Sequence, residues 1–357
     1  MDFGGTVVTG MDYHAHENLK KFLGIESSAD PIIDYTMGTV EPCAQIRRLA
    51  GSDFRRVGMN TIVPATIAQG TYEDGFGIML RRADPHLYFD VVRSPLADAD
   101  EHAIRRMKLP DPENPALYHG IRDKARELFE HTPYALVADF GVPGFYETSQ
   151  KLRGYENLAC DLLVNPGFVT SLYDRLLELQ KRFFGRYLAE VGEYVQVVGY
   201  ADDLGMQDRP QISPEVYRRL IKPYHKAIFR FIHEHADVRI LLHSCGAILP
   251  LIDDLVEAGV DILNPVQVRA ADMDPVKLKQ AFGRRLVFWG GIDVQQVIPR
   301  GSREEIFDAV RQVTTALGAG GGFILAPAHN IQEDTPAENV VHMCGAIRAH
   351  RVRRGAA

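Results

Sequence analysis

The residues best suited to metal or acid–base chemistry are His243 and Cys245. They are separated by one residue and directly follow the apolar run 238–242. Imidazole and thiolate are both ligands that Zn²⁺ prefers, and residues two apart at a strand end can turn toward one point. Such a pair is also compatible with an ordinary buried cysteine beside an unrelated histidine. His329 follows another apolar run, 322–328, and adds a ligand of the same kind. Three protein ligands and an open fourth position are typical of catalytic zinc, so we expect His243, Cys245 and His329 to bind the metal.

Two adjacent carboxylates, Asp202 and Asp203, follow the apolar run 194–200 and are the candidate catalytic residues. At least one of them is expected to cap a helix or a turn. The other has three alternatives: it completes the zinc shell, orients a ligand histidine, or holds a polar group of the substrate.

A further set of residues near predicted strand ends is expected to contact substrate, although each is also compatible with a packing or loop-tying role. Phe145 and Tyr146 would form an aromatic wall over the site. The polar members follow later strands; they are Gln267, Asp293, Gln295, Asn330 and Gln332. Other histidines lie in helical or polar stretches and are expected to be solvated or capping residues: His14, His16, His225, His233 and His235.

The elements that must position these residues alternate between short apolar runs and long amphipathic stretches, which indicates βα units and a parallel sheet. Six strands are predicted, at 134–140, 194–200, 238–243, 260–265, 285–291 and 322–328. Two more are expected around residues 1–6 and 52–59. Helices are predicted from Pro166, after an Asn165 cap, and over 213–236. Because functional side chains of a parallel barrel follow the strand ends at one rim, this arrangement would bring the candidate residues together.

The fold class we predict is α/β, a (β/α)8 TIM barrel with an N-terminal hairpin and helical embellishments. Residues 72–92 are expected to form the hairpin, with its turn near Asp84 and Pro85, and 108–120 a linker into a helix. The chain shows no convincing boundary, so residues 1–357 are expected to form a single domain.

Composition limits the function classes. The formal net charge is −7, and the isoelectric point is near 6.0, which disfavours a nucleic-acid partner. No run resembles a membrane span or a signal peptide, and four cysteines are too few to crosslink 357 residues. We therefore expect a cytoplasmic protein with free thiols and no membrane contact; a homodimer is compatible with the sequence.

Several segments resemble the uroporphyrinogen decarboxylase superfamily and, within it, the corrinoid-dependent methyltransferase branch. They are YADDLGMQ, ISPEVYRRLIKPYHK, LLHSCGAILPLIDDLVEAGVDILNPVQ, FWGGID and APAHNIQEDTPAENV, together with DFGGT and LPDPENP near the start. The resemblance covers essentially the whole chain. It implies a (β/α)8 barrel whose active site lies at the C-terminal rim.

The chain departs from this pattern in two places. Decarboxylases of the superfamily carry an early arginine-rich segment that grips porphyrinogen carboxylates, whereas residues 1–18 contain no arginine. Thiol-methylating members carry a later cysteine where His329 stands. Replacing that thiolate by neutral imidazole leaves Zn²⁺ more positive and makes it a stronger Lewis acid.

From this we expect a zinc-dependent methyltransferase that moves a methyl group from a small methylated substrate, a methyl ether or similar, to a corrinoid on a partner protein. The alternatives are a metal-free decarboxylase that uses Asp202 or Asp203 to protonate a carbanion, and a non-catalytic corrinoid or tetrapyrrole binder.

Overall fold

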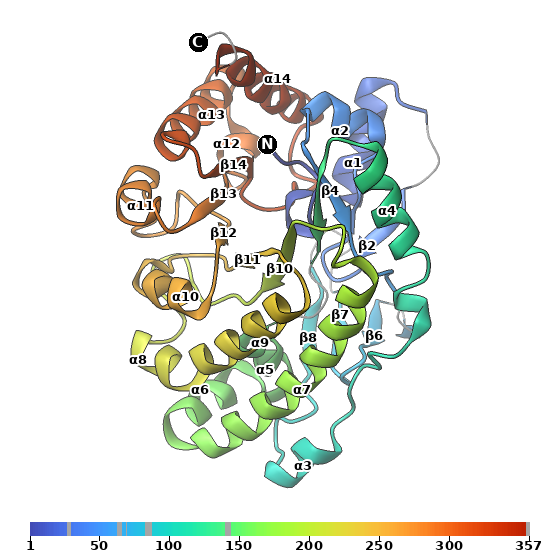
Figure 1. Cartoon of the computed structure of the whole chain (residues 1–357), viewed down its shortest axis with the longest axis vertical. Coiled ribbons are helices and arrows are strands. Elements are labelled where there is room, and N and C mark those ends of the chain that lie inside the picture. Colours follow the sequence, from blue (N-terminus) through green and yellow to red (C-terminus); the bar gives the residue numbers. More distant parts are fainter. Residues whose placement is uncertain (27–29, 63–65, 69, 83–87, 140–143, 355–357) are drawn as a thin grey trace.

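A parallel sheet of seven strands forms the centre of the molecule (Figure 1). The computed structural model describes every residue except 27–29, 63–65, 69, 83–87, 140–143 and 355–357. Neighbouring strands pair in parallel and follow the order of the chain: β4 (Phe54–Val57), β9 (Ala135–Ala138), β10 (Val197–Ala201), β11 (Arg239–His243), β12 (Ile262–Asn264), β13 (Val287–Ile292) and β14 (Phe323–Pro327). The six strands predicted between 134 and 328, and the one within 52–59, are confirmed.

The first residues of the chain take the eighth place and close the barrel. The Asp2 amide donates to the carbonyl oxygen of Leu325 in β14 at 2.9 Å, and the Asp53 amide, just before β4, donates to the Met1 carbonyl oxygen at 3.0 Å. The segment is not itself a strand, contrary to the prediction for residues 1–6, because the chain turns at once into a 3-10 helix (Val7–Thr9). The α/β barrel architecture is confirmed, with seven regular strands.

Helices surround this sheet (Figure 1). They are α1 (Tyr13–Leu23), α2 (Ala44–Ala50), α3 (Glu101–Arg106), α4 (Ile121–His131), α5 (Phe145–Arg153), α6 (Tyr155–Val164), α7 (Pro166–Val191), α8 (Pro214–Val216), α9 (Lys222–His235), α10 (Ile252–Ala258), α11 (Pro275–Phe282), α12 (Val297–Arg300), α13 (Arg303–Gly318) and α14 (Ala337–Arg354). Helix α7 begins as predicted, since the Asn165 side chain accepts from the Phe168 amide. The helix predicted over 213–236 is interrupted by a π-helical turn (Tyr217–Ile221) between α8 and α9.

Two small antiparallel sheets form a cover on the barrel mouth. The first joins β1 (Met11–Asp12), β3 (Thr39–Val40) and β2 (Ile32–Asp34). The second joins β5 (Thr66–Ala68), β6 (Thr71–Glu73), β7 (Met79–Arg81) and β8 (Asp90–Arg93) in that order. Antiparallel pairing of β7 with β8 confirms the predicted hairpin. Its predicted turn at Asp84 and Pro85 lies outside the described residues.

The barrel lumen changes from apolar to polar toward the mouth. A buried cluster fills it lower down, with Val137, Val197, Leu241, Ile262, Trp289 and Ala326 packed against Phe54. Because side chains alternate between the two faces of a strand, the residues two positions later also face the lumen, one layer nearer the mouth. On successive strands these residues are Arg56, Asp139, Gly199, His243 and Asn264. Polar side chains therefore line the bottom of the barrel mouth, and the buried cluster beneath them forms an apolar plug.

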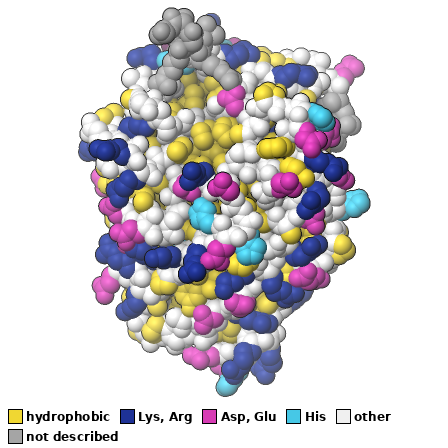
Figure 2. Space-filling view, in the orientation of Figure 1, with side chains coloured by type: hydrophobic (Ala, Val, Ile, Leu, Met, Phe, Trp, Pro, Cys, Tyr) yellow, Lys and Arg dark blue, Asp and Glu magenta, His cyan; other side chains and the backbone are white. Residues whose placement is uncertain are grey.

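The surface in view carries charged side chains of both signs, interspersed over the face that Figure 2 shows. Within the described residues, none of the helices is long and apolar enough to cross a membrane. That residues 1–357 form one domain stays a prediction.

Candidate metal centre and active site

The three predicted zinc ligands come together at the barrel mouth. One ligand atom each of His243, Cys245 and His329 lies within 4.8 Å of the other two. The Nε2 atom of His243 is 3.3 Å from the Cys245 sulfur, and the two imidazole rings are 5.6 Å apart between centroids. His243 ends β11 and His329 follows β14, so strands that are not neighbours supply the cluster.

Two asparagines orient the imidazoles. The Nδ1 atom of His243 lies 2.5 Å from Oδ1 of Asn264, and Nδ1 of His329 is hydrogen-bonded to Oδ1 of Asn330. An amide oxygen can only accept, so each Nδ1 donates a proton to its asparagine, and Nε2 is the ring atom placed to bind a metal. Histidines that bind metal through Nε2 are held in this way, and this donor set is one that Zn²⁺ prefers.

The charge state of the cluster depends on burial. Burial, followed by the neighbouring His243, lowers the pKa of His329 to about 4, so this imidazole is neutral at pH 7. Burial also raises the pKa of the Cys245 thiol well above its usual value, and the carboxylates of Asp203 and Glu147 add to this. A cation beside the sulfur would oppose all three effects and favour the thiolate.

The two candidate carboxylates have separate positions. Asp203 accepts a hydrogen bond from the Cys245 amide at 2.8 Å, and its Oδ1 lies 3.9 Å from Nε2 of His243. Asp202 is fully buried and accepts from the amides of Tyr146 and Glu147 at 3.1 and 2.8 Å, so it caps α5. Asp203 is therefore the carboxylate beside the cluster, and Asp202 is the expected cap.

The backbone after β10 is bonded to the loop that carries the cysteine. The Asp202 amide donates to the His243 carbonyl oxygen at 2.9 Å, and the Leu204 amide donates to Oγ of Ser244 at 3.0 Å. Together with the Asp203 contact, these bonds hold His243 and Cys245 in register with β10.

Behind Asp202 lies His225, whose prediction as a solvated or capping residue is wrong. It is fully buried, with Nε2 2.9 Å from Oδ2 of Asp202 and Nδ1 3.0 Å from the Tyr217 hydroxyl. Its helical spacing was an available signal, because His225 lies four residues after Ile221 and four before Phe229, both buried. His16 is likewise buried and not solvated.

Of the predicted substrate residues, two contact the cluster. Gln267 donates to the Cys245 sulfur at 3.4 Å and accepts from the Gly246 amide at 2.7 Å. Asn330 holds His329 and also accepts from the Tyr88 hydroxyl at 3.1 Å, while its Nδ2 donates to Oγ1 of Thr39 at 2.9 Å.

The other predicted substrate residues lie elsewhere. Phe145 and Tyr146 begin α5 and are packed inside the protein, with 0% and 2% of their surface exposed. Asp293 accepts from the Gln295 amide at 2.7 Å and faces Arg269 at 3.6 Å, and Gln295 itself is exposed. Gln332 donates to the Asn330 carbonyl oxygen at 3.3 Å.

A cavity of about 410 Å³ adjoins the cluster, within the usual range for small-molecule sites. The barrel contributes Arg56, Asp139, Ala201, Asp203, His243 and His329 to its lining, and α5 contributes Glu147, Thr148 and Lys151. The cover contributes apolar and acidic side chains, among them Ile33, Asp34, Met37, Tyr72, Asp74 and Phe76.

Sequence reasoning missed Arg56, Asp139 and Lys151 and assigned no role to Glu147, which follows Phe145 and Tyr146. A usable signal existed for Arg56 and Asp139, since each lies two residues after an apolar residue that faces the lumen. The Lys151 ammonium binds Glu147 at 2.6 Å. Burial raises the pKa of Glu147, with Asp203 adding to the effect and Lys151 opposing it.

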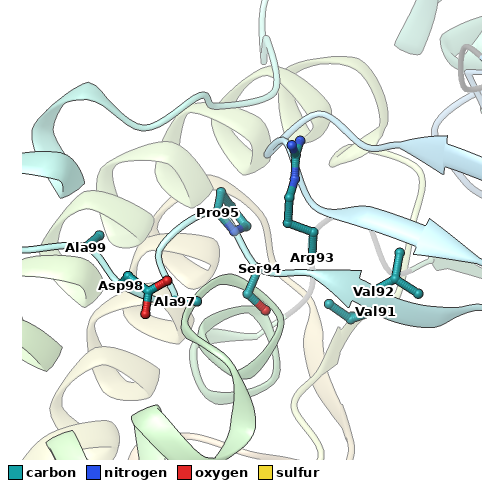
Figure 3. A pocket seen from close by; sticks show the side chains of 8 residues that line it. All are labelled: Val91, Val92, Arg93, Ser94, Pro95, Ala97, Asp98 and Ala99. Carbon is teal, nitrogen blue, oxygen red and sulfur yellow. The ribbon is translucent and has the colours of Figure 1, made fainter.

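Two other features are less suited to catalysis. One is a hollow of about 770 Å³ lined by residues between 91 and 99, which include no histidine or cysteine. Figure 3 shows the side chains that line it. His16, Glu17 and Asp30 could in principle hold a metal, but the Lys20 ammonium already binds the two carboxylates at 2.8 and 3.1 Å. Nε2 of His16 accepts from the Cys43 amide, so its Nδ1 carries the proton.

Comparison with known proteins gives the same fold and names a family. Over 206 residues the chain is 26% identical to the methylated-thiol–coenzyme M methyltransferase of Methanosarcina mazei, a match that covers 57% of this chain and 49% of that protein. The chain thus spans about half the length of the curated relative it matches. A solved methyltransferase from Methanosarcina mazei superposes with a TM-score of 0.66 at 16% identity and covers 97% of this chain and 93% of that one.

A more distant match is 3-keto-D-glucoside 4-epimerase from E. coli, with a TM-score of 0.38, 12% identity and coverage of 64% of this chain and 85% of that one. The family model described as uroporphyrinogen decarboxylase (URO-D) matches residues 91–350, well over half of the chain. The barrel, the cluster at its mouth and this match agree: the chain belongs to the uroporphyrinogen decarboxylase family.

Proposed function

We propose that this protein is a zinc-dependent methyltransferase that moves a methyl group from a small methylated compound, an ether or similar, to a corrinoid carried by a partner protein. The main support is the convergence of His243, Cys245 and His329 beside a cavity at the barrel mouth, with both imidazoles oriented by asparagines. The relative of known name is a methyltransferase that acts on a methylated thiol.

In this proposal His243, Cys245 and His329 hold the metal, and Asp203 is either the fourth ligand or the partner of the leaving group. When bound, zinc would supply Lewis acidity to the atom that loses the methyl group. With Asp203 as the leaving-group partner, two neutral imidazoles and one thiolate leave a net positive charge on the zinc site, which suits an oxygen leaving group; Asp203 as fourth ligand would cancel that charge.

The other residues of the site position these groups. Asn264 and Asn330 fix the imidazoles, while Gln267 donates to the sulfur and moderates its charge. The cover would shield the cavity from bulk water, which would strengthen the electrostatic interactions inside. We also propose that the protein is cytoplasmic, because a reducing compartment would keep its cysteines as free thiols.

One observation favours a second candidate, the metal-free decarboxylase. Arg56 lines the cavity and would offer its guanidinium group to a substrate carboxylate, and Asp203, in the same lining, would be the acid. In this alternative the protein would turn over a carboxylate without zinc.

Metal analysis and a transfer assay separate these functions. The purified protein is expected to contain about one zinc per chain and to methylate reduced cobalamin from at least one member of a panel of methyl ethers, thioethers and amines. Cys245→Ser protein is the matched negative control. Full activity without metal would reject the proposal, and absence of both zinc and turnover would favour a non-catalytic binder.

A further inference from the structure

Arg56 is a buried guanidinium on the floor of the cavity. It lies two residues after Phe54, which packs in the apolar plug, so it faces the lumen one layer nearer the mouth. Only 9% of its side chain is exposed, and it lines the same cavity as His243 and His329. A charge so deeply buried is expensive unless it is paired or binds a ligand.

The protein holds this side chain in one position. Its Nε donates to Oδ2 of Asp139, which also accepts from the Val7 amide at 3.0 Å. Gly58 leaves the room that the guanidinium occupies, because a Cβ at this residue would lie 2.0 Å from Nη2 and 2.1 Å from Cζ of Arg56. The neighbouring Arg55 points the other way and lies over the Tyr134 ring.

The rest of the guanidinium is available to a ligand. Neither Nη1 nor Nη2 donates a hydrogen bond to any residue that the structure describes, whereas Nε is used by Asp139. Two N–H groups in a fixed plane match the two oxygens of a carboxylate and bind it with charge-assisted hydrogen bonds.

We propose that Arg56 binds an oxyanion of the substrate, a carboxylate or a group of the same geometry, at the end of the molecule remote from the methyl group. The assignment of the methyl-bearing end to the metal cluster rests on the proposed function; the oxyanion site itself does not. The substrate class is then a methylated organic acid, not a neutral methylated compound.

The charges around the cavity determine where such an anion binds. The other carboxylates of the lining belong to the cover, to α5 and to the loop after β10: Asp34, Asp74, Glu147 and Asp203. They disfavour an anion near them, and the Lys151 ammonium in the same lining is already paired with Glu147, so the position beside Arg56 is favoured. In the sheet β9 and β10 separate β4 from β11, so an acid anchored at Arg56 extends across the mouth toward His243.

The test compares two nearly isosteric probes, 4-methoxybenzoate and 4-methoxybenzamide, by titration calorimetry on the zinc-loaded chain. Charge-assisted bonds to arginine should make the acid bind at least about tenfold more tightly than the amide. In Gly58→Ala protein the new Cβ displaces the guanidinium without removing any charge, so this preference should be lost while zinc content is unchanged. Arg55→Gln is the matched control and should keep the preference.

A second pair of variants, with a measurement on metal-free protein, distinguishes loss of the Arg56 contact from misfolding and from binding of the acid to the metal. Asp139→Asn frees Arg56 from its carboxylate partner and should tighten binding of the acid, whereas Arg56→Gln combined with Asp139→Asn leaves no buried unpaired charge and should abolish the preference. The same preference should appear in metal-free protein. An undiminished preference in Gly58→Ala and in the double variant, or one that requires zinc, would overturn the assignment of Arg56.

The outcome is independent of catalysis. Preference for the acid without methyl transfer from any donor would reject the proposed function and leave the oxyanion site standing. Methyl transfer from neutral ethers, with no preference for the acid, would support the proposed function and reject the oxyanion site at Arg56.

Discussion

His329 supplies a neutral imidazole where the family resemblance leads us to expect a thiolate. Its pKa is held at about 4 by burial and by His243, so it stays uncharged over the physiological range. If Zn²⁺ is held by His243, His329 and the Cys245 thiolate without a carboxylate ligand, the site keeps a positive charge, which increases the pull on a leaving oxygen. The identity of this one side chain is therefore the main determinant of the chemistry we propose.

Replacing His329 by cysteine should reduce demethylation while zinc stays bound. The second thiolate donates charge to the metal and weakens its Lewis acidity, and we expect the rate to fall about tenfold or more. Zinc content and methyl transfer to reduced cobalamin should be measured together on both proteins. An unchanged rate with zinc retained would refute the Lewis-acid argument.

Cys245→Ser should remove zinc without unfolding the barrel. Loss of a direct ligand should cost more than the roughly 10- to 100-fold in metal affinity that outer contacts cost. The fold is expected to persist because the described core is an extensive apolar cluster that includes none of the three proposed ligands. Metal analysis and thermal unfolding test this together, with Cys160→Ser, on the surface, as control. Collapse of the fold would show that the metal is structural.

At the scale of elements, the segment after β10 connects three parts of the site. Its backbone is bonded to the His243 loop, the Asp203 carboxylate receives the Cys245 amide, and the Asp202 carboxylate caps α5, which carries Glu147 and Lys151. His225, on α9, supports Asp202 from behind. The metal loop and the wall of the cavity are thus positioned from one strand end.

Removing His225 should destabilise the protein because Asp202 loses its buried partner. We expect His225→Leu to lower the free energy of unfolding by about 3 kcal/mol, and by less when Asp202→Asn is also present, since the two residues interact directly. Urea unfolding of the single and double variants measures this coupling. His233→Leu, on the same helix but partly exposed, is the control. Additive effects would show that the contact contributes little.

The strand-end rule located the metal-competent cluster and Asp203 because apolar runs and the polar residues after them are local patterns. It did not locate the cavity wall. Phe145 and Tyr146 follow a predicted strand, yet the Asp202 cap turns this segment into a helix that buries both rings. Arg56 and the cover residues depend on which face of a strand points inward and on how distant segments pack, and neither is a local property.

At the scale of the molecule, closure of the barrel depends on Asp2. Its carboxylate accepts from the Gly5 amide, the Thr9 hydroxyl, the Ser52 hydroxyl and Nε1 of Trp289, which joins the first residues to the lumen. Burial is the largest effect on this group and raises its pKa from 3.8 to about 6, against the opposing influence of these donors.

The stability contributed by Asp2 should therefore fall as pH rises. Between pH 4 and 6 the unfolded chain loses this proton before the folded chain does, so the free energy of unfolding decreases, by up to about 3 kcal/mol. Asp2→Asn removes this dependence, and its stability relative to the unaltered protein should improve with rising pH. Urea unfolding of metal-free protein at several pH values measures the difference, with Asp308→Asn as control. A difference that is constant with pH would contradict the assignment.

Asn330 connects the cluster of His243, Cys245 and His329 to both sheets of the cover. Its hydrogen bonds reach Thr39 of β3 and Tyr88 just before β8. The same amide orients His329, so separation of the cover from the barrel would break hydrogen bonds to the side chain that positions a proposed metal ligand. By reciprocity of coupled equilibria, any compound that draws the cover shut must raise the affinity for zinc by the factor by which zinc raises the affinity for that compound. If the cluster holds zinc as we propose, the rate at which zinc leaves the protein should then depend on how often the cover opens.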